Sequence, residues 1–195
     1  MSQTKTQLVA SPLNLNGADL TFPSAQGSAG QYLRNSGTAG TLEFANGGKI
    51  LQVVQGSTST QVAVATTTFT DTSLTASITP SSSSNKILVI VDQMFQTTKT
   101  TAGQGMGIRV LRDSTTIHDP VRDSTGAFDN YVNSSTGFYG RFTITKLDSP
   151  SSTSSLTYKT QGRPYTTANT GKVFFNIAGT QANATSYITL IEVAA

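Results

Sequence analysis

The chain has no cysteine and one histidine, and these absences exclude several kinds of chemistry. Without cysteine there is no disulfide framework, no thiolate metal site and no cysteine nucleophile. The single histidine, His118, lies in the stretch TTIHDP, directly before Asp119. Adjacent residues of an extended chain point to opposite sides, so these two do not suit a catalytic relay. No GxSxG motif is present either, and we interpret His118 as a surface loop residue.

Charged residues are also scarce, at 12% of the 195 residues. The net charge of +3 comes from 13 Lys and Arg against 10 Asp and Glu, spread thinly along the chain. Nucleic-acid binding normally depends on grouped Lys and Arg side chains that contact several phosphates. No such group occurs in the sequence, so we expect no nucleic-acid partner.

Long apolar runs are missing as well. The longest aliphatic run, ILVIV, covers residues 87–91. A membrane-spanning helix needs roughly 20 apolar residues, and residues 1–10 lack the apolar core of a signal peptide. We therefore expect no membrane partner.

The sequence is rich in threonine and serine, with 33 Thr and 23 Ser. Threonine favours strands, whereas serine and glycine favour turns. Alternating β-branched and aromatic residues predict strands within residues 49–55, 61–70, 73–79, 85–97, 106–113, 136–147, 155–161, 172–179 and 185–195. This spacing predicts an all-β fold, an antiparallel, jelly-roll-like β-sandwich that forms a head domain over residues 49–195.

Residues 1–48 have a different composition. The stretch SPLNLNGADLTFP predicts a small hairpin that turns at Asn16-Gly17. Behind it, GSAGQYLRNSGTAGTLEFANGG repeats a glycine-rich decamer roughly twice and contains few large apolar side chains. Ordering the backbone costs about 1 to 2 kcal/mol per residue, which these side chains cannot offset alone. The segment is therefore either a flexible linker or is ordered by surfaces that its own chain does not supply.

The last predicted strand, in TSYITLIEV, is apolar on both faces. Ile188 and Leu190 lie on one face, while Tyr187 and Ile191 lie on the other. Strands of this kind are buried on both sides, which predicts either the middle of a sheet or a sheet whose outer face meets another subunit.

Two regions resemble known phage proteins. GQYLRNSGTAGTLEF resembles the "GQVL-spacer-W" element of bacteriophage tail-fibre and appendage proteins, with Tyr32 at the Val position and Phe44 in place of the Trp. KILQVVQ, FTDTSLTASITPSSSSNKILVIV and the final YITLIEVAA are similar to a β-sandwich head of structural proteins from marine and cyanobacterial phages.

The resemblance implies a trimeric fibre or surface appendage, a tail fibre or a capsid decoration, located in the virion and assembled in the host cytoplasm. It implies that Leu33, Leu42 and Phe44 are buried against their symmetry copies in an extended N-terminal segment, which also docks on other virion proteins. We further expect the strand with Ile188 and Leu190 to lie at the trimer core.

Catalytic and metal-binding patterns are weak. Asp113, Asp119, Asp123 and Asp129 fall close together in sequence and could converge on Ca²⁺, but their spacing matches no known loop and arginines lie among them. The sequence GQGMG has the wrong spacing for a phosphate loop. We therefore expect a protein that is not an enzyme, without cofactor or metal.

Binding is the remaining chemistry. The long connection at residues 118–137 is rich in turn formers and carries Arg122, Phe128, Asn130 and Tyr131. A second connection, residues 161–171, carries Arg163 and Tyr165 on either side of Pro164. Long loops on a rigid sandwich often contact ligands, although aromatic residues in such loops also serve as anchors to the sheet. The alternative function is thus an adhesin that recognises a host-surface glycan or protein.

Overall fold

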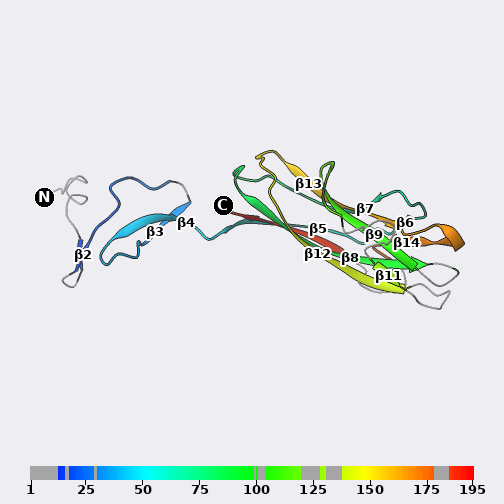
Figure 1. Ribbon diagram of the computed structural model, residues 1–195. Helices are drawn as coiled ribbons and strands as arrows, with labels where there is room; N and C mark the ends of the chain where they lie inside the picture. Colours follow the sequence, from blue (N-terminus) through cyan, green and yellow to red (C-terminus); the bar gives the residue numbers. More distant parts are fainter. Residues whose placement is uncertain are drawn as a thin grey trace. The chain divides into compact units, whose positions relative to one another are not determined.

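The computed structural model describes residues 13–15, 18–28, 30–98, 100, 104–119, 128–130, 138–177 and 185–195. The chain forms two compact units, Met1–Lys49 and Ile50–Ala195. The division falls one residue after the boundary expected from the sequence. Figure 1 shows both units.

The N-terminal unit contains two small antiparallel hairpins. Strands β1 (Leu13–Leu15) and β2 (Ala18–Leu20) pair antiparallel, as expected for the first hairpin; the predicted turn residues Asn16 and Gly17 lie outside the described residues. The glycine repeat, for which the sequence predicted no strands, forms β3 (Gln31–Asn35) and β4 (Leu42–Asn46). Between these strands, Gly37 and Gly40 have φ values of 88° and 73°. Glycine adopts this left-handed region without steric cost, so the repeat supplies the turn of its own hairpin.

The head consists of two antiparallel sheets (Figure 1). The six-stranded sheet has the order β5-β15-β8-β14-β6, with β12 also paired to β8. Its strands are β5 (Ile50–Thr58), β6 (Val62–Val64), β8 (Lys86–Thr98), β12 (Phe138–Asp148), β14 (Lys172–Phe175) and β15 (Ser186–Val193).

The five-stranded sheet has the order β10-β9-β13-β7, with β11 also paired to β9. Its strands are β7 (Thr70–Ile78), β9 (Gln104–Arg112), β10 (Thr115–His118), β11 (Phe128–Asn130) and β13 (Leu156–Pro164). A short 3₁₀ turn, η2 (Ala168–Thr170), precedes β14, and the described residues contain no α-helix. The fold is therefore an all-β antiparallel sandwich, as the strand spacing predicted.

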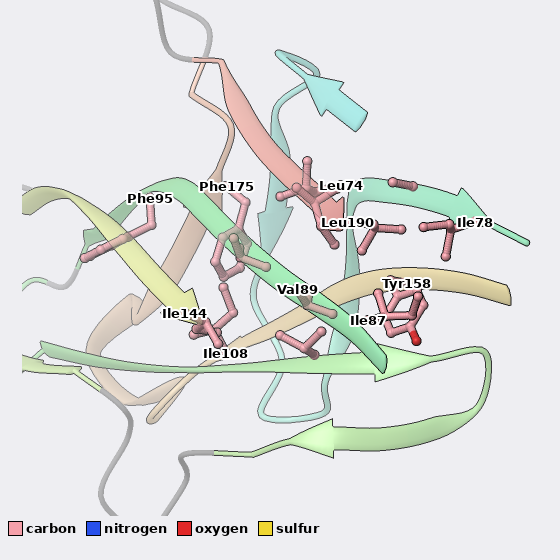
Figure 2. Close-up of a cluster of buried hydrophobic side chains, with 14 of the residues drawn as sticks. Leu74, Ile78, Ile87, Val89, Phe95, Ile108, Ile144, Tyr158, Phe175 and Leu190 are labelled. Carbon is pink, nitrogen blue, oxygen red and sulfur yellow. The ribbon is translucent and has the colours of Figure 1, made fainter. Parts of the chain in front are cut away.

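One hydrophobic core fills the space between the two sheets (Figure 2). Strand β8 buries every second side chain, including Ile87, Val89 and Val91, and β15 adds Ile188 and Leu190. The facing sheet contributes buried side chains of β7, β9 and β13, namely Leu74, Ala76, Ile78, Met106, Ile108, Val110, Leu156 and Tyr158. This burial explains the strict alternation of the strands, because successive side chains of a strand point to opposite faces.

A fully buried polar cluster interrupts this core. Gln93 of β8 donates from Nε2 to Oδ1 of Asn176 at 2.9 Å and accepts at Oε1 from the hydroxyl of Thr160 at 2.6 Å. Asn176 in turn donates from Nδ2 to the carbonyl oxygen of Thr72 at 2.6 Å. The side chains of Gln93, Asn176, Thr160 and Thr72 are all fully buried, with 0% exposure. Gln93 lies in the six-stranded sheet and Asn176 directly follows its strand β14, whereas Thr72 and Thr160 lie in the five-stranded sheet. Buried polar groups are tolerated when they are hydrogen-bonded in this way.

Glu192 is a buried carboxylate near the end of β15, with 0% exposure. Its Oε1 accepts hydrogen bonds from the Ser81 amide at 2.7 Å, the Ser81 hydroxyl at 2.8 Å and Asn85 Nδ2 at 2.7 Å, and its Oε2 accepts from Gln52 Nε2 at 2.6 Å. Burial acts to raise the pKa of Glu192, but these hydrogen bonds outweigh it and hold the pKa below its ordinary value. Glu192 thereby ties β15 to β5 and to the connection between β7 and β8.

Candidate functional site

The outer face of the six-stranded sheet carries an apolar row across four adjacent strands. Ile191 of β15 lies opposite Val53 of β5 on one side and opposite Leu88 of β8 on the other. Leu88 in turn lies opposite Leu147 of β12. We call these four residues the apolar row. Because residues opposite each other in paired strands share a face, the row is continuous across the sheet.

Water reaches much of the apolar row. Val53 is 59% exposed and Leu147 is 49% exposed, while Leu88 and Ile191 are partly exposed. Ile50 and Leu51, at the start of β5, are also exposed. Covering a large aliphatic side chain completely is worth roughly 1.5 to 3 kcal/mol. This face is therefore suited to contact another apolar surface.

Polar pairs border the apolar row farther along the same strands. Arg141 of β12 forms two hydrogen bonds to the carboxylate of Asp92, both at 2.7 Å. Gln55 donates to the hydroxyl of Thr189 at 2.9 Å. Polar pairs thus lie next to the apolar row on the outside of the six-stranded sheet.

The structure places Ile188 and Leu190 on the opposite face of β15. Both have 0% exposure and pack in the core of the single chain, where Figure 2 shows Leu190 near Leu74. Strand β15 is central in its sheet, as predicted. However, the two side chains expected at the trimer core are already covered by their own chain. The face of β15 left for another copy is the one that carries Ile191.

In the N-terminal unit, the three residues expected at the trimer contact share one face of a hairpin. Leu33 lies opposite Phe44, and Asn35 lies opposite Leu42. Leu33 is 40% exposed and Phe44 is 38% exposed, so the hairpin leaves this face largely uncovered. On the other face, Arg34 forms an exposed ion pair with Glu43 at 2.8 Å. One face of the hairpin thus carries exposed apolar side chains although its sequence is rich in glycine.

The outer face of the five-stranded sheet has a different character. The guanidinium of Arg109 lies 4.3 Å from the ring centroid of Phe69, and that of Arg163 lies 5.0 Å from the same centroid. Two cations therefore share one aromatic ring. Arg163 was a candidate from the sequence, whereas Phe69 and Arg109 were not, because Phe69 lies in a threonine-rich run and Arg109 lies within a strand. Only the strand register brings the three together.

Hydrogen bonds fix the surroundings of this ring. Arg109 donates from Nε and Nη2 to Oε1 of Gln161 at 2.9 and 2.7 Å. Asp71 accepts from Lys159 Nζ at 2.8 Å. Burial acts to raise the pKa of Asp71, but the hydrogen bonds from Lys159 and Gln161 outweigh it and lower the pKa, helped by the charges of Lys159 and Arg109. Tyr165, which follows the strand, is 42% exposed.

The other loop residues chosen from the sequence are only partly described. Phe128 and Asn130 belong to β11, whose backbone pairs with β9 at Met106 and Gln104. Arg122 and Tyr131 lie outside the described residues. Of the loop candidates with described side chains, Arg163 lies on the outer face of β13 and Tyr165, just after the strand, is exposed.

His118 and Asp113, which the sequence offered for catalysis and for Ca²⁺, lie at or next to the ends of strands in the five-stranded sheet. His118 ends β10 and lies opposite Val110. Asp113 accepts a hydrogen bond from the Thr157 amide at 2.9 Å. Arg112 pairs with Asp148 at 2.6 Å, and Asp148 also accepts from the buried Tyr158 hydroxyl at 2.7 Å.

Within the described residues, no group of three or more His, Cys, Asp or Glu side chains is placed to hold a metal ion. Across the same part of the chain, no helix has the length and hydropathy of a membrane span.

No family model and no curated protein sequence matches the chain. Among solved structures, the chain matches chains of infectious bursal disease virus, from the Gt strain with a TM-score of 0.38 and 11% identity, and from the Gx strain with 0.39 and 12%. Each similarity covers 99% of this chain, which spans about half of the viral chains, 54% and 53%. TM-scores below 0.5 define neither a shared fold nor a shared function.

Proposed function

We propose that the chain is a non-enzymatic structural protein of a bacteriophage particle that forms a trimeric fibre or surface appendage. The observation that carries this proposal is the exposed apolar row of the head, Val53, Leu88, Leu147 and Ile191. The head has its own buried core, yet it leaves a continuous apolar surface uncovered. Such a surface fits contact with further copies of the chain.

The N-terminal unit supports the same proposal. Leu33 and Phe44 form an exposed apolar pair on one face of the β3–β4 hairpin. Two-stranded hairpins are marginal alone, and packing against further copies stabilises them. The resemblance of this segment to phage appendage proteins implies three copies and an attachment to other virion proteins.

A direct test is the mass of the full chain in solution. Light scattering should give about three times the 20.4 kDa of one chain. A monomer at micromolar concentration would contradict the trimer. Gold-labelled antibodies on purified particles should then show whether the protein is part of the tail, the baseplate or the capsid; particles without label would contradict the virion role.

The second candidate function is an adhesin that recognises a host surface. The cluster of Phe69, Arg109 and Arg163, with the exposed Tyr165 nearby in sequence, favours it because these side chains suit ligand contact. A trimer would present three such clusters and gain avidity. Purified protein that adsorbs to host cells and blocks infection supports this function.

A further inference from the structure

The outer face of the five-stranded sheet holds two guanidiniums whose donors are only partly used. Arg109 engages Nε and Nη2 with Gln161, and Arg163 donates from Nη1 to the carbonyl oxygen of Thr67 at 3.1 Å. A guanidinium carries five N–H donors, so both side chains retain donors. Neither forms an ion pair with a carboxylate of the described residues.

We propose that this face binds an acidic polysaccharide, with Arg109 and Arg163 holding its carboxylate or sulfate groups beside Phe69. Each guanidinium lies within 5.0 Å of the same ring centroid, so two positive charges gather around one aromatic ring. Like charges in one place repel, and an anion bound beside them relieves the repulsion. Planar arginine side chains bind carboxylate and sulfate oxygens through paired hydrogen bonds.

The neighbouring carboxylate, Asp71, forms no hydrogen bond or ion pair with either guanidinium. Asp71 is already bonded to Lys159 and Gln161. Gln161 bridges Asp71 on β7 and Arg109 on β9, and so holds the Arg109 guanidinium in place. The arginines are thus oriented before any ligand arrives, which reduces the entropy lost on binding.

The rest of the face suits sugar hydroxyls. Strand β13 pairs with β7 and β9 along its length and presents Thr157, Lys159, Gln161 and Arg163 in alternation. The hydroxyl groups of Ser77 and Thr157 are hydrogen-bonded to each other at 3.0 Å beside this row. Position 107, opposite Arg163 on β9, is a glycine and adds no side chain there. A sheet face of this kind favours an extended polymer.

A nucleic acid is the less suitable anion. Phe69 is covered by two guanidiniums and is not free to stack on bases. The cations of this face are also few compared with the several phosphate contacts of nucleic-acid-binding proteins. This proposal rests on the second candidate function, the adhesin, and names its ligand class; it does not need the trimer or the virion role, because binding is measured with the purified chain alone.

The test is equilibrium binding of the full chain to four probes at about 0.15 M ionic strength, where weak surface attraction is screened. The probes are polygalacturonate, dextran sulfate, neutral dextran and duplex DNA. We expect binding to one or both acidic polysaccharides and none to neutral dextran. The double variant Arg109→Gln/Arg163→Gln should weaken this binding about tenfold or more.

A matched variant separates the site from general charge. Arg34→Gln/Lys86→Gln removes the same number of positive charges from exposed positions elsewhere. Its affinity should stay within about twofold of the unchanged protein. The proposal is overturned if no acidic polysaccharide binds, if DNA binds as tightly, or if both double variants behave alike. Thermal melting of each variant confirms that the comparison is between folded proteins.

Discussion

Gly56 of β5 lies directly against the backbone of Thr75 in β7, so that a Cβ at position 56 would overlap the Thr75 carbonyl oxygen. The two strands belong to different sheets, and each lies at the end of its sheet's strand order. Here the sheets approach so closely that only a glycine fits. The contact therefore closes one side of the sandwich.

We expect Gly56→Ala to destabilise the head by about 3 kcal/mol, because a backbone oxygen cannot move aside as a flexible side chain can. Urea unfolding measures the loss. Gly48→Ala is the matched control, because nothing lies within 4 Å of a Cβ at that position. Equal stability of the two variants would show that β5 and β7 separate easily.

Removal of the Glu192 carboxylate should also be costly. Glu192→Ala removes the acceptor shared by Ser81, Asn85 and Gln52; of these donors Asn85 is buried, whereas Gln52 is partly buried and Ser81 is exposed. An unsatisfied buried donor costs about 1 to 3 kcal/mol and a more exposed one costs less, so we expect a loss of about 2 to 4 kcal/mol in the free energy of unfolding. The exposed Glu43→Ala variant should change it by less than about 1 kcal/mol.

The same carboxylate predicts a pH dependence. The pKa of Glu192 is lower in the folded chain than its ordinary value, so its ionisation stabilises the fold. This contribution is complete above the unfolded pKa of about 4.3 and is lost as the pH falls through the folded value. Unfolding between pH 7 and pH 2 should show a shallower loss in Glu192→Gln than in the unchanged protein. If both proteins lost the same amount of stability as the pH falls, ionisation of Glu192 would not be the cause of the loss.

The apolar row can be tested without disturbing the core. Val53→Asp places a charge on an exposed strand position, so the chain should still fold but should lose its trimeric mass in light scattering. Thr116→Asp, on the exposed side of β10, should remain trimeric. If the Val53→Asp protein were still trimeric, the apolar row would not be the interface between the copies.

Leu190→Asp should behave differently from Val53→Asp. Leu190 is fully buried between the two sheets of one chain, and an unpaired charge there costs several kcal/mol. We expect an insoluble or unfolded protein whether or not it assembles. A soluble Leu190→Asp protein with normal melting would contradict the packing in Figure 2.

The head should fold without the N-terminal unit. A chain of residues 50–195 keeps the core and both sheets. Circular dichroism should show its β-sheet spectrum and one cooperative melt. If the N-terminal unit docks on the particle, this shortened chain should not join particles that lack the native protein.

The sequence predicted the long strands because one face of each enters a common core, as in β8, where Ile87, Val89 and Val91 alternate with less buried residues. It missed the short strands β10, after the turn at Asp113, and β11, and it missed the hairpin of the glycine repeat. Strands β3 and β4 contain no Val, Ile or Thr, so local propensity does not mark them although they are neighbours in sequence. The sequence also ended β13 early, since Gly162, Arg163 and Pro164 are typical of a turn; this end is a strand because it pairs with the distant strands β7 and β9.

The candidate surfaces were predictable to different degrees. The alternation of the last strand predicted its central position in the sheet, but not that Ile188 and Leu190 face the chain's own core while Ile191 faces outward. Which residues of the strand face the core depends on which of its two faces the other sheet covers. Phe69 and Arg109 lie 40 positions apart in sequence and meet only through the pairing of β13 with β7 and β9.

The buried polar cluster around Gln93 also bears on how the chain finds its strand register. Strand β8 is apolar on both sides, with Leu88 and Ile90 alternating with Ile87 and Val89. A slip of one position exchanges the two sides, and hydrophobic burial alone would scarcely oppose it. The slip would, however, turn Gln93 outward and leave Asn176 and Thr160 buried without their partner. The cluster therefore makes a sandwich with slipped strands less stable than the native one. It helps a threonine-rich chain, whose strands resemble one another, to fold with a single strand register.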